Sequence, residues 1–210
     1  MPDSIPPKNL LLVEGSDDRE VVYQLANEAG IPRGSFTAKP KAGYPNLIQT
    51  LEVELLASEL KRLGILVDAD FDLAARWQSL RNRLLALGYD AIPPQPVPGG
   101  AIIHHDTQPR VGIWVMPNNT LPGMLEDFAA YLISAEDNLW HYARQCVSQI
   151  ADPDCRFPRQ HEIKAQIHTW LAWQAEPGRP IGLAIKMRYL DTAVPQAQQF
   201  IAWLRQLFNL

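Results

Sequence analysis

"ILVDADFDLAARW", residues 65–77, contains the transition from strand to helix that decides the fold. The apolar run Ile65–Val67 predicts a buried strand, and three aspartates follow it at alternate positions. From residue 73 onward, leucine and tryptophan recur at helical spacing, which predicts a core-facing helix over residues 71–87. Like charges clustered at the end of a buried strand need a reason, and there are two: they cap the helix or they hold a cation.

The same alternation of strand and helix occurs three times in the first ninety residues. Apolar runs predict strands at residues 9–13, 35–38 and 65–67, and amphipathic patterns predict helices at residues 17–30, 46–62 and 71–87. Strands that alternate with helices in this way form a parallel sheet with right-handed crossovers. We therefore predict an α/β fold.

The second half of the chain has a different pattern. A proline-rich connector at residues 93–100 leads into a predicted β-hairpin arm formed by Ala101–His105 and Val111–Met116. Helices are then predicted at about residues 122–133, 136–149, 159–174 and 195–208. We expect residues 1–133 to form the sheet domain with its added hairpin, and residues 134–210 to form a helical C-terminal extension packed on the same domain.

Composition narrows the class of protein. The 210 residues are 47% hydrophobic and 20% charged, as in ordinary globular proteins, and no apolar run reaches the ~18 residues of a membrane span. The N-terminus has no apolar signal-peptide core, so we expect a cytoplasmic protein without membrane contact. Because the net charge is −4, nucleic acid would be bound only through a local basic patch or bridging metal ions. A protein partner or a homo-oligomer stays open.

Carboxylates follow two of the predicted strands directly. Glu14 comes after the first strand, and Asp68 and Asp70 come after the third. In a parallel α/β sheet, ligands bind beyond the carboxyl ends of the strands, where the strand order reverses. If these strands are neighbours, the three carboxylates share one crevice, and oxygen ligands of this kind suit Mg²⁺ or Mn²⁺.

Helix capping is the alternative explanation for these acids. Acidic residues in a first helical turn stabilise the helix, which by itself explains Asp72 and the pair Asp17 and Asp18, with Glu20 completing a capping box. Glu14 and Asp68 follow apolar strands directly and precede the first helical turn, so capping explains them less well. If capping were the whole explanation, Asp68 and Asp70 would accept hydrogen bonds from backbone amides of the next helix.

These motifs resemble a known domain. Val13–Gly15 after the first strand and Val67–Asp70 after the third resemble the Toprim domain of topoisomerases, primases and overcoming-lysogenization-defect (OLD) nucleases, and "LLVEGSDD" is similar to the OLD-like branch. "VGIWVMPNNTLPGMLEDF", residues 111–128, is similar to a family of uncharacterised Toprim-related proteins, DUF3226-like in pattern. The resemblance covers roughly residues 9–133.

The resemblance implies roles for individual residues. Glu14 would be a catalytic acid or base, or a metal ligand, and Asp68 and Asp70 would bind the metal. Further roles would fall to Glu126 and Asp127 as a second carboxylate cluster, and to Gly15, Lys39 and Lys41 as phosphate-binding residues. From the residues alone, Lys39 and Lys41 can equally be solvated loop charges.

The expected function follows from the fold and from these residues. A Toprim-like protein with this site would be a Mg²⁺- or Mn²⁺-dependent nuclease or phosphoryl-transfer enzyme acting on nucleic acid or a nucleotide. The chain has no tyrosine in a topoisomerase-like setting and lacks the ATPase half of OLD proteins. The alternative is a Toprim-like binding or regulatory protein without catalysis.

Overall fold

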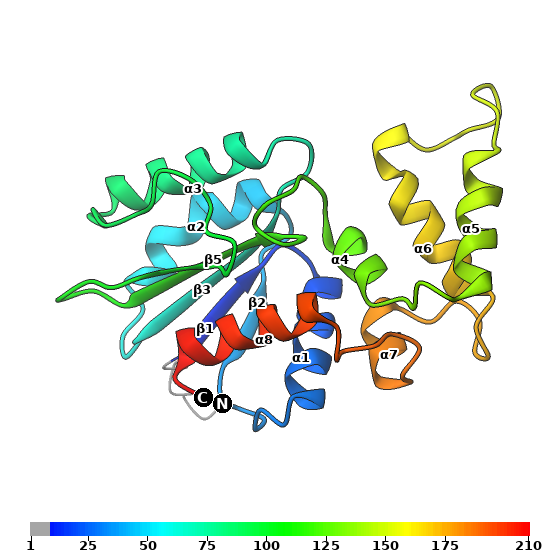
Figure 1. Cartoon of the computed structure of the whole chain (residues 1–210). Helices are drawn as coiled ribbons and strands as arrows, with labels where there is room; N and C mark the ends of the chain where they lie inside the picture. The colour runs from blue at the N-terminus through cyan, green and yellow to red at the C-terminus, as the bar shows by residue number, and fades with distance from the viewer. Residues whose placement is uncertain (1–8) are drawn as a thin grey trace, which may run out of the picture.

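A five-stranded sheet forms the centre of the protein in a computed structural model, which describes residues 9–210 (Figure 1). The strands run in the order β2-β1-β3-β5-β4, and all neighbours are parallel except β4 and β5. The predicted α/β class and the hairpin arm are confirmed. The strands are β1 (Asn9–Val13), β2 (Thr37–Pro40), β3 (Arg62–Asp68), β4 (Ala101–Ile103) and β5 (Arg110–Met116).

Helices cover both faces of this sheet. In Figure 1, α2 and α3 lie on one face, and α1 and α8 lie on the other. The helices are α1 (Ser16–Glu28), α2 (Tyr44–Leu55), α3 (Leu73–Ala86), α4 (Leu125–Tyr131), α5 (Asn138–Ser148), α6 (Glu162–Ala172), α7 (Ile181–Lys186) and α8 (Pro195–Phe208), with a 3-10 turn at Arg159–His161.

The strand β3 is buried on both faces, which explains its continuous apolar sequence. Leu66 enters the core formed with α1 and α8, whereas Ile65 and Val67 enter the core formed with α2 and α3. Alternate residues of a strand point to opposite faces, so a strand in the middle of a covered parallel sheet has no polar side.

The last helix belongs to the core of the sheet. Leu207 of α8 packs directly on Gly112 of β5, where a Cβ atom would lie 2.7 Å from the Leu207 Cδ2 atom. Trp203 of α8 lies 5.7 Å from Trp114 of β5, measured between ring centroids. The α8 helix therefore covers one apolar face of the sheet. The predicted domain division at residue 133 stays a prediction.

Helices α5 and α6 form a separate layer, whereas α7 packs on α1. Helices α5 and α6 pack on each other, and α6 also packs on α4. Figure 1 shows this pair beyond the carboxyl ends of the strands, on the far side of α4 from the sheet. As a result, Lys164 of α6 reaches the edge of the sheet where the acidic motifs lie.

Several predicted boundaries are wrong. The helix expected over residues 46–62 ends at Leu55, because the chain turns at Glu59, whose φ is +67°, and enters β3 at Arg62. The helix expected at residues 122–133 begins at Leu125, so Pro122 precedes the helix instead of starting it. The strand expected at residues 35–38 is Thr37–Pro40, and the short helix α7 has no counterpart in the prediction.

No helix within residues 9–210 has the length and apolar character needed to cross a membrane. The N-terminal residues 1–8, on which the expectation about a signal peptide rests, lie outside the described residues.

Candidate functional site

The strands β1 and β3 are neighbours, and the strand order reverses between them. Val13 of β1 pairs with Leu66 of β3, and β2 lies on the other side of β1. This is the position where open α/β sheets bind ligands. Glu14 follows β1, Asp68 ends β3, and the Glu14 Oε1 atom accepts a hydrogen bond of 3.0 Å from the Asp68 backbone N–H. The structure therefore places these two predicted residues side by side.

Two further carboxylates join them in a pocket of about 320 Å³. Asp18 comes from the first turn of α1 and Glu126 comes from α4, and both residues are buried. These four carboxylates from four separate segments, together with the exposed Asp17, line one cavity, which we call the acidic pocket. Its lining residues are Glu14, Gly15, Ser16, Asp17, Asp18, Ala42, Gly43, Asp68, Leu125, Glu126 and Lys164.

The charges in the acidic pocket disfavour one another. Burial, followed by the nearby charges of Asp18, Glu14 and Glu126, raises the pKa of Asp68 well above its ordinary value. Burial raises the pKa of Asp18 from 3.8 to about 6, although a hydrogen bond from the Gly15 N–H opposes the shift. The Asp68 Oδ1 atom is buried and has no hydrogen-bond partner among residues 9–210. A site of this kind needs a proton or a cation.

One cation lines the acidic pocket. Lys164 extends from α6, and its Nζ atom lies 2.8 Å from the Glu126 Oε1 atom. The hydrogen bond to Glu126 raises the pKa of Lys164, with a smaller effect from the charge of Asp68, so the ammonium group stays charged at neutral pH. One ammonium group cannot neutralise four carboxylates, and half of the Lys164 side chain is exposed at the mouth of the pocket.

Asp70 lies outside the acidic pocket. Its carboxylate forms an ion pair with Arg76, and the Arg76 guanidinium carbon lies 3.7 Å from the centroid of the Tyr44 ring. The backbone of Asp70 has a φ of +52° and exchanges two hydrogen bonds with Gly123, of 2.9 and 2.8 Å. The role of Asp70 as a metal ligand stays a prediction, and in this structure its partner is Arg76.

The aspartates after β3 have three different roles. Asp72 caps α3, because its Oδ1 atom accepts a hydrogen bond of 2.9 Å from the Ala75 N–H. This confirms the interpretation of Asp72 as a helix-start residue. Within the described residues, neither Asp68 nor Asp70 takes such a capping role. Helix capping alone therefore does not explain these two carboxylates.

The start of α1 differs from the predicted capping box. Gly15 is the N-cap residue, and its N–H donates a hydrogen bond of 2.8 Å to the Asp18 Oδ2 atom. The prediction that Asp17 and Glu20 form the box is wrong, because the helix begins at Ser16, one residue earlier than expected. A side chain at Gly15 would crowd Asp18, since a Cβ atom there would lie 3.2 Å from the Asp18 Oδ2 atom.

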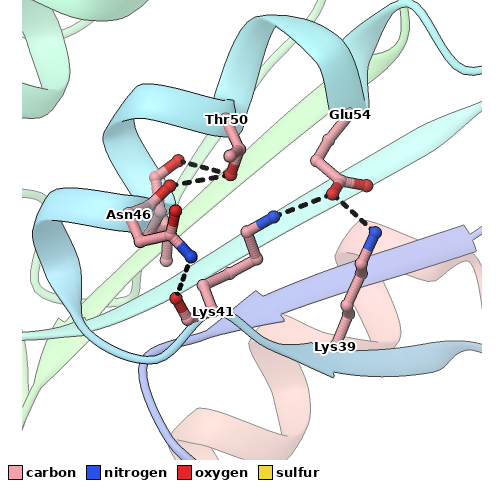
Figure 2. Close-up of polar contacts among 6 residues, drawn as sticks. Lys39, Lys41, Asn46, Thr50 and Glu54 are labelled. Atoms are coloured by element: carbon pink, nitrogen blue, oxygen red, sulfur yellow. Dashed lines mark hydrogen bonds and ion pairs between the residues drawn. The ribbon is translucent and has the colours of Figure 1, made fainter.

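Lys39, in β2, and Lys41, which follows this strand, bind a carboxylate outside the acidic pocket. Figure 2 shows Lys39 and Lys41 directed at Glu54 of α2, and their Nζ atoms lie 2.6 and 2.9 Å from its Oε1 atom. Lys41 is only 7% exposed. Phosphate binding by these lysines stays a prediction, and both ammonium groups are engaged by Glu54. The residues that follow Lys41 and line the acidic pocket are Ala42 and Gly43.

The expected second carboxylate cluster divides in the structure. Glu126 lines the acidic pocket together with Asp68. Asp127 instead caps its own helix, because its Oδ2 atom accepts a hydrogen bond of 2.8 Å from the Met124 N–H. The two adjacent residues point in different directions, as neighbours on a helix do, so only Glu126 adds to the site.

Comparison with known proteins places the chain in a family. The family model described as "Protein of unknown function (DUF3226)" matches residues 8–209, which is nearly the whole chain. The chain belongs to the DUF3226 family. This confirms that part of the resemblance and extends it across the C-terminal helices. Among functionally curated proteins, no match is found for this DUF3226 chain.

One solved structure is similar to the DUF3226 chain along its length. It is the C-terminal region of the OLD protein of Xanthomonas campestris pv. campestris, with a TM-score of 0.46 and 16% sequence identity. The similarity covers 98% of this chain and 98% of the other.

Two residues of the DUF3226 site were missed in the sequence. The sequence predicts Asp18 only as an acid at the start of a helix, but this residue, four positions after Glu14, also lines the pocket. Lys164 gives no local signal, because only the packing of α6 against α4 brings it to the pocket. Spacing after a strand could have identified the first residue, whereas the second requires the tertiary structure.

The donor set of the DUF3226 protein fits a hard divalent cation by its chemistry. Carboxylate oxygens are the ligands that Mg²⁺ and Mn²⁺ prefer, and the Asp68 Oδ1 atom lacks any other partner among the described residues. Within residues 9–210, no three His, Cys, Asp or Glu side chains are already arranged as a metal site. Ligation would therefore require the carboxylates to draw together around the ion.

Proposed function

We propose that this protein is a metal-dependent nuclease or phosphoryl-transfer enzyme on a Toprim-like α/β fold, acting on nucleic acid or a nucleotide. One observation carries the proposal: four carboxylates converge at the point where the strand order reverses, around a buried oxygen of Asp68 that has no partner among residues 9–210. The Toprim assignment is supported by Glu14 after β1 and by the Asp68–Asp70 motif after β3.

The candidate ligands are the carboxylates nearest to Asp68. Asp68 and Glu14 would hold Mg²⁺ or Mn²⁺, with Asp18 and Glu126 completing the negative charge of the pocket. A bound cation of this kind would polarise a phosphate group and stabilise the charge that develops during its transfer. Asp70 would join the set only if its ion pair with Arg76 opens.

The side chains of the protein provide the remaining functions. If Glu14 does not bind the ion, it is instead suited to take up or release a proton, because the hydrogen bond from the Asp68 N–H fixes it and burial raises its pKa. Lys164 stands half exposed at the mouth of the pocket, where its ammonium group can donate hydrogen bonds to a phosphate oxygen. Its bond to Glu126 has to open for this, because in this structure Lys164 is the counterion of that carboxylate.

The proposal is tested by cleavage assays with single- and double-stranded DNA and RNA in the presence of Mg²⁺ or Mn²⁺. Glu14→Gln and Asp68→Asn are expected to remove metal-dependent cleavage, because each loses a charge that the reaction needs. Asp154→Asn is the matched control, since this aspartate is exposed and lies outside the acidic pocket. Cleavage that persists in both pocket variants would show that the site is assigned wrongly.

A non-catalytic binding or regulatory role is the second candidate, favoured by the ion pair between Lys164 and Glu126. In that case Lys164 would be the permanent counterion of the carboxylates, and no metal would be needed. Calorimetric titration with Mn²⁺ separates the two candidates. The enzymatic proposal expects binding that Asp68→Asn weakens, whereas absence of binding by the unmodified protein favours the regulatory role.

A further inference from the structure

A second, shallower pocket of about 300 Å³ lies beside the acidic pocket, on the α3 side of β3. Its walls include Tyr44, Ala69, Asp70, Phe71 and Arg76. We call it the aromatic pocket. The side chain of Phe71 is 62% exposed there. Single exposed apolar residues are common, so exposure alone assigns no role to Phe71.

The surroundings of Phe71 hold it in place. The preceding residue, Asp70, is bonded to Gly123 through both its N–H and its carbonyl oxygen. The following residue, Asp72, caps α3 through its side chain. Phe71 is thus presented to solvent between two anchored residues, which is the setting of a rigid contact residue.

Arg76 and Tyr44 supply further planar groups to the lining of the aromatic pocket. The guanidinium carbon of Arg76 lies 3.7 Å from the centroid of the Tyr44 ring, and the same guanidinium pairs with Asp70. Only 13% of the Arg76 side chain is exposed. Aromatic rings and guanidinium planes are the groups on which proteins stack unpaired bases. The ion pair makes this part of the lining nearly neutral, so it does not repel the π-face of a base.

We infer that Phe71, with Tyr44 and Arg76, forms a stacking site for an unpaired nucleobase, and that the substrate is single-stranded nucleic acid. The inference rests on the proposed function and narrows its substrate class. Phe71 follows Asp68 by three residues, so their Cα atoms are at most ~11 Å apart. A strand whose phosphate lies at the acidic pocket can therefore place a base of an adjacent nucleotide on Phe71.

Stacking would also give a negatively charged protein affinity for nucleic acid. The net charge is −4 and the acidic pocket adds local repulsion, so contacts to phosphates alone give weak affinity. Base stacking does not depend on net charge, and loss of one stacked base weakens binding by about 5- to 150-fold. Phe71→Ala is expected to weaken binding of a single-stranded oligonucleotide by a factor in this range.

Fluorescence anisotropy with two labelled oligonucleotides of equal length tests the inference. One oligonucleotide carries all its bases, and the other has abasic residues in its central part. Phe71→Ala should weaken binding of the first and leave binding of the second unchanged, whereas Phe71→Trp should retain both affinities. Tyr142→Ala on α5 is the matched control, because this aromatic side chain is similarly exposed at 58% and lies outside both pockets.

Three results would overturn the inference. In the first, Phe71→Ala and the unmodified protein bind the complete oligonucleotide with equal affinity. In the second, Phe71→Ala weakens binding of the abasic oligonucleotide as much as binding of the complete one. In the third, the protein binds double-stranded nucleic acid more tightly than single-stranded nucleic acid. The proposed function is tested separately by Mn²⁺ titration, which Phe71→Ala should not change. If the protein does not bind Mn²⁺ but Phe71→Ala weakens oligonucleotide binding as expected, the metal site is rejected. If the protein binds Mn²⁺ but Phe71→Ala has no effect on oligonucleotide binding, only the stacking site is rejected.

Discussion

Removal of Glu54 is expected to destabilise the protein more than removal of either lysine that it binds. Lys39 and Lys41 share the Oε1 atom of Glu54, and Lys41 is almost fully buried (Figure 2). Glu54→Gln leaves a buried ammonium group without its carboxylate. In contrast, Lys41→Met removes a buried charge, and Glu54 keeps Lys39 as its partner.

The expected magnitudes follow from this asymmetry. Loss of one partner of a buried ion pair costs ~3–5 kcal/mol of unfolding free energy. We expect about 3 kcal/mol for Glu54→Gln, because the amide oxygen still accepts a hydrogen bond. Lys41→Met should cost at most ~1 kcal/mol, since an apolar side chain of similar volume replaces a buried charge. Lys39→Met should cost less than ~1 kcal/mol, because half of this side chain is exposed.

The effect should also depend on pH. Burial by itself raises the pKa of Glu54, but the hydrogen bonds and charges of Lys39 and Lys41 outweigh it and lower the pKa below its ordinary value of 4.5. A carboxyl group with a lowered pKa stabilises the folded state above its unfolded pKa, and this contribution is lost as the pH falls through the folded pKa. The difference between Glu54→Gln and the unmodified protein should therefore shrink in acid.

Urea denaturation at pH 7 and pH 4 measures these differences directly. The double variant Lys41→Met/Glu54→Gln serves as the internal control, and it should be more stable than Glu54→Gln alone because no buried ammonium group is left unpaired. If Glu54→Gln costs no more than Lys41→Met, or if the two effects simply add, the buried pair does not work as described.

Three further predictions concern the acidic pocket and the core. Burial raises the pKa of Asp18 from 3.8 to about 6, so the folded state holds a proton that the unfolded state releases, and stability falls as the pH rises through this range. In urea denaturation, Asp18→Asn should therefore stabilise the protein by up to about 3 kcal/mol at pH 8 and by little at pH 3.5. Gly112→Ala should destabilise by ~1–3 kcal/mol in thermal unfolding, because a Cβ atom there would lie 2.7 Å from a methyl group of Leu207, whereas Gly99→Ala meets no atom within 4 Å and should change little. Lys164→Met should strengthen Mn²⁺ binding in calorimetry by removing a competing cation, yet weaken cleavage.

Each of these predictions has a contradicting outcome. A stability change for Asp18→Asn that is the same at both pH values would mean that its charge is not penalised in the folded state. Equal thermal midpoints for Gly112→Ala and the unmodified protein would mean that α8 does not pack tightly on the sheet. Unchanged Mn²⁺ affinity in Lys164→Met would mean that Lys164 does not compete for the carboxylates.

Most of the fold could be predicted because its signals are local. Apolar runs such as Ile65–Val67 and the helical spacing of leucines lie within single elements, and the alternation of these elements predicts the parallel sheet. The end of α2 was missed because apolar residues continue past Leu55 at helical spacing, although a positive φ at Glu59 turns the chain. The placement of α8 on Gly112 depends on contacts between distant segments, for which the sequence carries no local pattern.

The residues of the candidate site also differ in whether a local sequence signal predicts them. Glu14 and Asp68 could be predicted because each follows a buried strand directly, and their convergence needed only the assumption that the strands are neighbours. The interpretation of Asp18 depended on where α1 begins, which was placed one residue too late. For Lys41 the sequence leaves phosphate binding and a solvated loop charge equally open, because its partner Glu54 lies on the following helix. Lys164 could not be predicted, since only tertiary packing brings α6 to the strand ends.

Anomalous diffraction from a crystal grown with Mn²⁺ tests the central claim most directly. The predicted result is a strong anomalous peak in the acidic pocket, bound by Asp68 and Glu14, with Lys164 moved away from Glu126. The absence of any peak there at saturating Mn²⁺, with the Lys164–Glu126 ion pair intact, would contradict the assignment of this pocket as a metal site.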